Sequence, residues 1–220
     1  MFKSKINQIR TFFIIWMILI GVFEVNTPVH FLVLNTFLAY IPIELSFLLI
    51  NPNVKKHNLL FWPIWVIWLL FYPNTPYILT DLFHLAQLQP YNAEGLIKLS
   101  TPMWISYTFL FVSAVGFALI GFDGLIKISR IIANKIKTNP SLGLTISIIT
   151  ILTFLSSVGV FIGRFLRIHT IYLFISPRLF ITPLIKMWQP RMMAFVLLFT
   201  FIQLFIYWII SLIVSDYHKN

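Results

Sequence analysis

Two short polar segments carry the residue types that could do chemistry in a chain that is otherwise largely apolar. In the first, Asp81 and His84 lie three positions apart, so one turn of helix would place them side by side. A carboxylate beside an imidazole orients the ring and raises its basicity, which suits acid–base work. Asp81 and His84 are therefore the candidate catalytic residues, and Asn74 and Thr80 in the same segment are candidate ligand-binding residues.

The second polar segment contains Arg164 and Arg167, which are again three positions apart. At the end of a helix this spacing projects both guanidinium groups from one side. Each group can bind two oxygens of a phosphate or a carboxylate. Arg164 and Arg167 are therefore candidate ligand-binding residues for an anionic group.

The sequence indicates no metal site and no cofactor. The chain contains no cysteine, and Asp81 with His84 supplies two ligands where most metal sites need three or more. No phosphate-binding loop, zincin motif or nucleophile elbow is present. The net charge of +10 could suggest nucleic acid, but the basic residues sit between apolar spans. Membrane lipids with anionic headgroups fit this arrangement better, so no nucleic-acid partner is expected.

The elements that must position these residues are transmembrane helices. Hydrophobic residues make up 59% of the 220 residues and charged residues 10%, against about 25% charged in soluble domains. Because a spanning helix needs about 20 mainly apolar residues, five or six spans with short loops use the whole length. We predict an all-α transmembrane bundle with short interfacial helices, forming a single membrane domain over residues 1–220. The six predicted spans are approximately residues 11–25, 29–50, 59–72, 102–120, 142–162 and 192–214.

Three segments between the spans are predicted to lie at the membrane interface. Residues 77–89 form a short amphipathic helix that follows Pro76, with Thr75 as its N-cap. Residues 127–137 are basic with isoleucines at helical spacing, which is typical of a separate amphipathic helix on an anionic membrane face. Residues 164–189 are apolar but interrupted by prolines, so we expect them not to cross the bilayer.

The distribution of Lys and Arg predicts the orientation in the cell membrane. With a cytoplasmic N-terminus, ten of these residues fall in inside loops and six in outside loops, which favours cytoplasmic positions for both termini. Both polar segments then follow the outer ends of spans. We therefore predict an outward-facing cluster of Asp81, His84, Arg164 and Arg167 that binds an anionic or lipid headgroup ligand. A structural ion pair between Asp81 and one of the arginines is the alternative.

Glu44 is an ionisable residue inside a predicted span, near the cytoplasmic third. No basic residue that could pair with it is visible in any predicted span. We expect its carboxyl group to be hydrogen-bonded to a neighbouring helix, with a role in proton relay as the alternative.

Three segments resemble a family of bacterial membrane proteins, the domain-of-unknown-function family 1361. They are residues 35–42, 71–85 and 163–167, with the sequences NTFLAYIP, FYPNTPYILTDLFHL and GRFLR. The chain departs from the family pattern after Arg167, where it continues with residues 168–172 instead of the expected Asn or Ser, Trp and Asp. Glu44 also stands where the family pattern has an aliphatic residue. The resemblance implies a multi-pass membrane protein and implies no particular activity.

Three functions are compatible with these features. The first is binding of an anionic or lipid headgroup ligand, by a protein that could also act as a non-catalytic partner of another membrane protein. The second is an outer-leaflet enzyme acting on a lipid or lipid-linked substrate, with Asp81 and His84 moving protons. The third is a small transporter or flippase, whose polar path would have to include Asn35 and Glu44.

Overall fold

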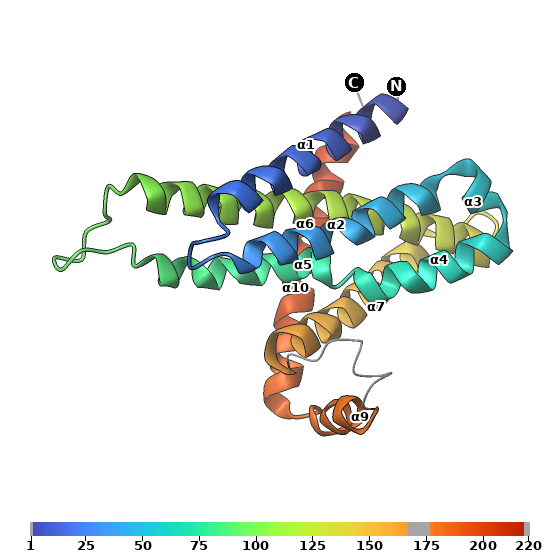
Figure 1. The fold of residues 1–220 in the computed structure, drawn as a ribbon. Helices are drawn as coiled ribbons and strands as arrows, with labels where there is room; N and C mark the ends of the chain where they lie inside the picture. Colours follow the sequence, from blue (N-terminus) through green and yellow to red (C-terminus); the bar gives the residue numbers. More distant parts are fainter. Residues whose placement is uncertain (1, 167–176, 218–220) are drawn as a thin grey trace. The chain divides into compact units, whose positions relative to one another are not determined.

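The regular structure of the described chain is helical, which confirms the predicted all-α fold class (Figure 1). This computed structural model describes residues 2–166 and 177–217. An isolated bridge between Tyr91 and Ile97 closes the turn that precedes α6. In chain order the elements are α1 (Phe2–Phe23), α2 (Phe31–Ile50), α3 (Pro52–Lys56), α4 (Asn58–Phe71), α5 (Asn74–Tyr77), η1 (Ile78–Leu88), α6 (Thr101–Ile136), α7 (Leu142–Phe161), η2 (Ile162–Leu166), α9 (Pro177–Lys186) and α10 (Pro190–Tyr217).

Five helices of the described chain, and not six, are long and apolar enough to cross a membrane by themselves: α1, α2, α6, α7 and α10. The predicted span 59–72 corresponds to α4, which has 14 residues. At about 1.5 Å per residue it is about 21 Å long, short of the roughly 30 Å of a bilayer core. The chain nevertheless continues through α5 and η1, and all three elements pack along α2 (Figure 1).

The break after α4 is made by local hydrogen bonds around Pro73. The Asn74 side chain donates to the carbonyl of Phe71 at 2.9 Å and so satisfies one of the last carbonyls of α4. The prediction that Thr75 caps the next helix is wrong. α5 begins one residue earlier, and the Thr75 hydroxyl donates to the carbonyl of Ala39 in α2 at 3.2 Å. Thr75 therefore fastens the break to a neighbouring helix.

The predicted fourth span and the predicted surface helix 127–137 are one continuous helix, α6, of 36 residues. Ile128, Ile131 and Ile132 are buried at 0–6% exposure. The expectation that this apolar face lies on a membrane surface is therefore wrong, because the protein itself covers it. Periodicity alone shows that a face is apolar and not which partner covers it.

The chain forms two compact units, Met1–Gly124 and Leu125–Asn220. In the first unit, Phe13 of α1 packs against Tyr40 of α2 and Phe117 of α6, with ring centroids 5.7 and 4.2 Å away. In the second unit, α7 and α10 pack together around buried polar groups. The Gln203 amide donates to Ser157 Oγ at 2.8 Å and to the Thr153 carbonyl at 3.2 Å. The predicted single membrane domain stays a prediction.

Two glycines of α6 allow close contacts with neighbouring elements of the first unit. A Cβ atom added at Gly121 would lie 2.0 Å from Thr75 Cγ2, and one added at Gly124 would lie 2.6 Å from Ser46 Oγ. Both neighbours are buried, and Ser46 Oγ also accepts a hydrogen bond from Trp68 Nε1 at 3.0 Å. The missing side chains let α6 approach α2 and α5 directly.

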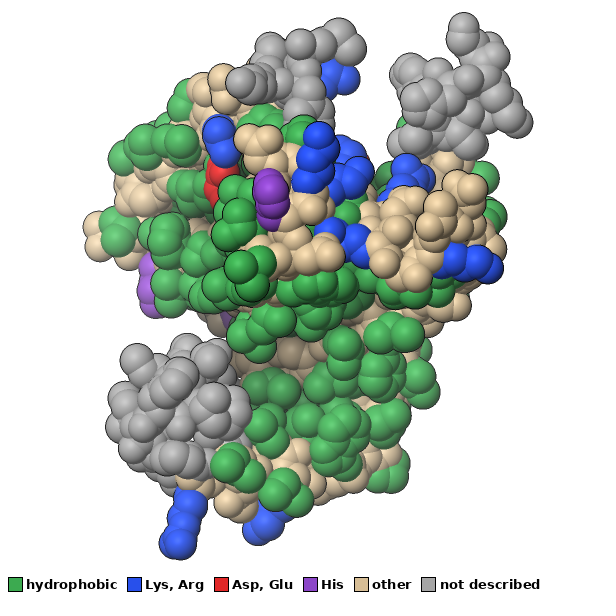
Figure 2. All heavy atoms as spheres, turned by 90° about the vertical axis from the view of Figure 1, so that its right-hand side faces the viewer, with side chains coloured by type: hydrophobic (Ala, Val, Ile, Leu, Met, Phe, Trp, Pro, Cys, Tyr) green, Lys and Arg blue, Asp and Glu red, His purple; other side chains and the backbone are tan. Residues whose placement is uncertain are grey.

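Large hydrophobic side chains remain on the outer surfaces of the long helices. They include Ile18 and Val22 of α1, Leu155 of α7 and Phe201 of α10, which are 45–68% exposed. Figure 2 shows such side chains, in green, over much of the visible surface. Exposed apolar area of this extent marks surfaces that contact lipid or other proteins. The helices therefore have the apolar outer surface that is typical of a membrane protein.

Candidate functional sites

Asp81 is buried in the first unit, with 1% of its surface exposed. The Asn35 amide of α2 donates to its Oδ2 atom at 2.8 Å. Asn35 begins the first of the three family-like segments and Asp81 lies in the second, so the fold joins these two segments by a hydrogen bond. A buried carboxylate needs such donors, because leaving it without them costs several kcal/mol. The sequence placed both residues in notable segments but gave no sign of this pairing.

His84 lies one turn beyond Asp81 in η1, a 3₁₀-helix in which residues three apart are stacked. Its Nδ1 atom lies 3.2 Å from the Asp81 carbonyl oxygen and 3.9 Å from the carboxylate Oδ1. The second distance is too long for a hydrogen bond. The ring also packs against Phe31 of α2, with centroids 4.2 Å apart. Asp81 and His84 are thus neighbours, and their catalytic role stays a prediction.

The two other candidates in this segment make local backbone contacts. Thr80 is 4% exposed, and its hydroxyl donates to the carbonyl of Tyr77 at 2.6 Å. The Asn74 amide bonds to Phe71 as described above. These contacts stabilise the turn and the start of η1, and the predicted ligand-binding roles of Asn74 and Thr80 stay predictions.

Arg164 lies in η2, a five-residue π-helical turn at the end of α7. Arg167 lies outside the described residues. Since Asp81 and His84 belong to the first unit and Arg164 to the second, the predicted meeting of these side chains stays a prediction.

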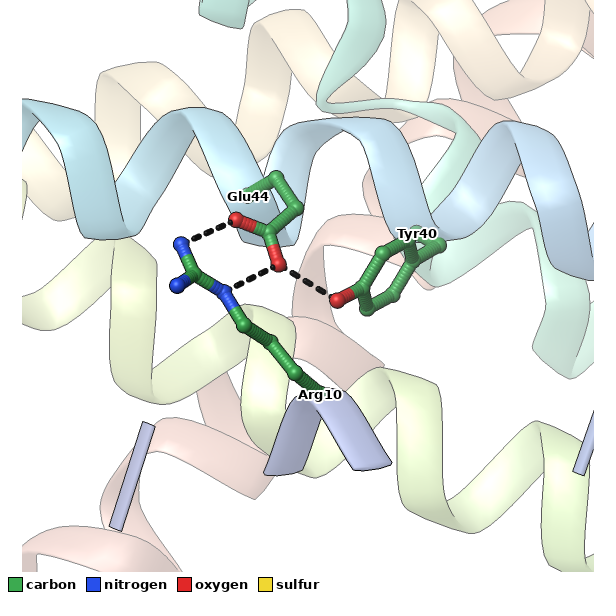
Figure 3. Close-up of polar contacts among 3 residues, drawn as sticks. All are labelled: Arg10, Tyr40 and Glu44. Carbon is green, nitrogen blue, oxygen red and sulfur yellow. Dashed lines mark hydrogen bonds and ion pairs between the residues drawn. The ribbon is translucent and has the colours of Figure 1, made fainter. Parts of the chain in front are cut away.

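Glu44 has a basic partner, which corrects the expectation that none was available. Arg10 of α1 donates from Nε and Nη2 to the two carboxylate oxygens at 2.8 and 2.7 Å, and the Tyr40 hydroxyl donates to the same carboxylate (Figure 3). The Arg10 guanidinium also lies 6.0 Å from the Phe47 ring centroid. The first predicted span began at Thr11 and left Arg10 in a loop, whereas α1 includes it. A two-pronged pair of this kind fixes the relative register of α1 and α2.

A cavity of about 460 Å³ lies beside the Arg10–Glu44 pair. Asn7 and Asn51 add polar groups to it. Its apolar wall consists of Ile6, Leu45, Phe47 and Leu48. The side chain of Arg10 is 45% exposed and that of Glu44 is 32% exposed, so the pair is accessible from this cavity.

Asn35 and Glu44 do not line a common path along α2. They are nine positions apart, which is two and a half helical turns and puts them on opposite sides of the helix. Asn35 bonds to Asp81 in η1, and Glu44 bonds to Arg10 in α1. A transport path through both side chains therefore has no support in the first unit.

A second cavity, of about 600 Å³, lies within the second unit between η2, α9 and the start of α10. Phe161, Phe165 and Phe195 line it, and their ring centroids are 4.9 to 5.8 Å apart. Lys186 and Arg191 also line it, and both are exposed. Sequence inspection did not single out Lys186 or Arg191 as ligand-binding residues, although both flank a proline-rich apolar segment.

No group of three or more His, Asp or Glu side chains that could hold a metal ion occurs among the residues that the structure describes. Both cavities described above instead combine charged side chains with an apolar wall. Such an arrangement can bind an amphiphile through a charged group and a hydrophobic surface together.

Together these features define the class: an α-helical membrane protein with several helices able to cross a bilayer. The chain belongs to a family described as "Protein of unknown function (DUF1361)", whose model matches residues 34–206. This match confirms the family resemblance found in the three sequence segments. Searches of curated proteins and of solved structures gave no match.

Proposed function

We propose that this multi-pass protein of the cell membrane binds a phosphate-bearing anionic amphiphile in the cavity of its second unit. The ligand class is a phospholipid or a lipid-linked phosphate. The observation that carries the proposal is the combination of Lys186 and Arg191 with an aromatic wall in one cavity. The aromatic wall suits an acyl or polyprenyl chain, and the two cations suit the phosphate.

The charge of the second unit supports an anionic ligand. The unit contains ten Lys and Arg residues and one acidic residue, Asp216. The first unit is nearly balanced, with six basic and five acidic residues. One acidic side chain cannot balance the charge of ten basic ones, and phosphate groups of anionic lipids are counter-charges available at a membrane surface.

The local structure around the cavity also supports a position at the membrane interface. Trp188 lies between Lys186 and Arg191 in sequence and is 56% exposed. Tryptophan is enriched at the level of lipid headgroups because its ring is both apolar and a hydrogen-bond donor. A π-helical turn such as η2 frequently occurs at functional sites. It brings Phe165 to the cavity directly after Arg164.

Binding without catalysis is favoured over the enzyme alternative. The Nδ1 atom of His84 lies 3.9 Å from the Asp81 carboxylate Oδ1, beyond hydrogen-bond distance, so this pair gives the enzyme alternative less support than the cavity gives to binding. Cytoplasmic termini and an outward-facing position for the segment that follows the fifth predicted span remain predictions from the Lys and Arg distribution. Under them, the ligand would be held at the outer leaflet.

The proposal is tested by measuring lipid retention by native mass spectrometry of the purified protein. Phosphatidylglycerol should be retained in preference to phosphatidylcholine. Arg191→Gln should weaken the retention about fivefold, and Lys186→Gln with Arg191→Gln about 30-fold, at roughly 1 kcal/mol for each cation. Arg178→Gln is the matched control, because Arg178 is exposed on α9 and does not line the cavity.

Two further arms identify the source of the anionic group. A polyprenyl phosphate should compete with phosphatidylglycerol if the site accepts lipid-linked phosphates. Inorganic phosphate should not compete, because it lacks the chain that contacts the aromatic wall. Equal retention of both phospholipids, or equal losses in Arg178→Gln and Arg191→Gln, would overturn the proposal.

A further inference from the structure

The Arg10–Glu44 pair in the first unit has unused hydrogen-bonding capacity. An arginine side chain has five N–H donors, and Arg10 uses two of them on Glu44. A carboxylate has about four lone-pair sites, and Glu44 uses three on Arg10 and Tyr40. The described contacts therefore leave donors on Arg10 beside an acceptor position on Glu44.

These groups face the cavity between α1 and α2. Glu44 is six residues before the end of α2, about 9 Å along the helix axis. Asn7 and Asn51 lie at the same cavity, and Asn51 is the residue that follows α2. The cavity thus combines a paired cation and anion, two amides and an apolar wall near a helix end. Because α2 has 20 residues and is about 30 Å long, the thickness of a bilayer core, the end of the cavity at Asn51 lies at the level of lipid headgroups.

We infer that this cavity binds a zwitterionic phospholipid whose headgroup carries a phosphate and a primary ammonium, as in phosphatidylethanolamine. The phosphate accepts hydrogen bonds from the free edge of the Arg10 guanidinium and from the Asn7 amide. The ammonium donates to the Glu44 carboxylate. The first part of the acyl chain lies against Ile6 and Leu48, which line the same cavity.

Charge complementarity selects this headgroup over the other common ones. A purely anionic headgroup would add a negative charge beside the Glu44 carboxylate and bring no cation of its own, while Arg10 is already paired with Glu44. A choline headgroup carries a positive charge but no N–H, so it cannot donate a hydrogen bond to Glu44. An ammonium with three donors satisfies both conditions. This site is in a different unit from the cavity of the proposed function and does not depend on it.

The experiment compares retention of three lipids by native mass spectrometry: phosphatidylethanolamine, phosphatidylcholine and phosphatidylglycerol. The protein carries Lys186→Gln and Arg191→Gln, so that the second-unit cavity does not contribute. We expect about tenfold preference for phosphatidylethanolamine over phosphatidylcholine, the value of one charge-assisted hydrogen bond. Glu44→Gln should abolish this preference, because a neutral amide binds an ammonium weakly.

A cavity-filling variant separates binding from folding. Leu48→Trp places a large ring in the cavity and keeps both residues of the ion pair, and should remove phosphatidylethanolamine retention at unchanged thermal stability. Leu34→Trp is its matched control. Leu34 lies on the same helix and is 56% exposed outside the cavity, so this variant should bind like the parent. Equal retention of the three lipids, a preference for phosphatidylglycerol, or unchanged retention in Leu48→Trp would overturn the inference.

Discussion

Replacing Gly121 by alanine adds only one methyl group but should clearly destabilise the first unit. The new Cβ would lie 2.0 Å from Thr75 Cγ2 and 3.0 Å from Thr75 Cβ, far inside van der Waals contact. Thr75 cannot rotate freely, because its hydroxyl bonds to Ala39. Overpacking of this kind costs about 1–3 kcal/mol and a lost hydrogen bond adds about 1 kcal/mol. We therefore expect a loss of about 2–4 kcal/mol.

The assay is reversible unfolding of the purified protein in mixed micelles, followed by tryptophan fluorescence. Gly116→Ala is the matched control in the same helix, since the nearest atom to its new Cβ is Phe13 Cε1 at 3.9 Å. That substitution should be neutral or stabilising by up to about 1 kcal/mol, because alanine favours helix over glycine. If Gly121→Ala is as stable as Gly116→Ala, the close approach of α6 to α5 is wrong.

A double substitution tests the mechanism of this loss. Thr75→Ser removes Cγ2, the atom 2.0 Å from the new Cβ, and keeps the hydroxyl that bonds to Ala39. By itself it should cost about 1 kcal/mol for the lost buried methyl group. Combined with Gly121→Ala it should restore part of the lost stability, so its effect changes sign between the two backgrounds. Additive losses would refute a direct clash between these residues.

Two further substitutions test the buried polar contacts by the same unfolding assay. Asn35→Leu removes the amide that donates to the buried Asp81 carboxylate, and should cost about 1.5–3 kcal/mol; a change below about 0.5 kcal/mol would show that this bond does not hold η1 on α2. Gln203→Leu removes two interhelical hydrogen bonds but also a buried Oε1 atom that has no hydrogen-bond partner. An interhelical hydrogen bond in a membrane contributes about 0.6 kcal/mol on average. The free energy of unfolding should therefore change by no more than about 1 kcal/mol. A larger loss would mean that Gln203 is essential to α7–α10 packing.

Helix positions were predictable wherever an apolar run ended at a proline or a polar turn. The predicted span 29–50 corresponds to α2 at Phe31–Ile50, and the predicted span 142–162 to α7 at Leu142–Phe161. The number of spanning helices was not predictable in the same way. α4 has the composition of a span, and the break at Pro73 leaves it about 21 Å long.

Pairing between helices was the main feature that sequence patterns missed. Arg10 and Glu44 are 34 positions apart, and no periodicity links them. The contact of Gly121 with Thr75 was missed as well, because Gly121 and Gly124 are three positions apart and do not form the small-xxx-small pattern that indicates close helix packing. In both cases, which residues come into contact depends on how two helices pack against each other.

The sequence by itself determined the apolar surroundings that the helices require, the fold class and the family. An excess of apolar residues with few charges requires lipid or protein contact around helices, because only helices and closed barrels satisfy the backbone in a bilayer. The sequence also marked Asp81, His84 and Arg164 as unusual. The tertiary structure decided which side chains meet. Hydrogen bonds join Asp81 to Asn35 and Glu44 to Arg10. Lys186 and Arg191 line one cavity together with aromatic side chains. Side-chain types and spacing are local, whereas a binding site depends on which helix faces come together.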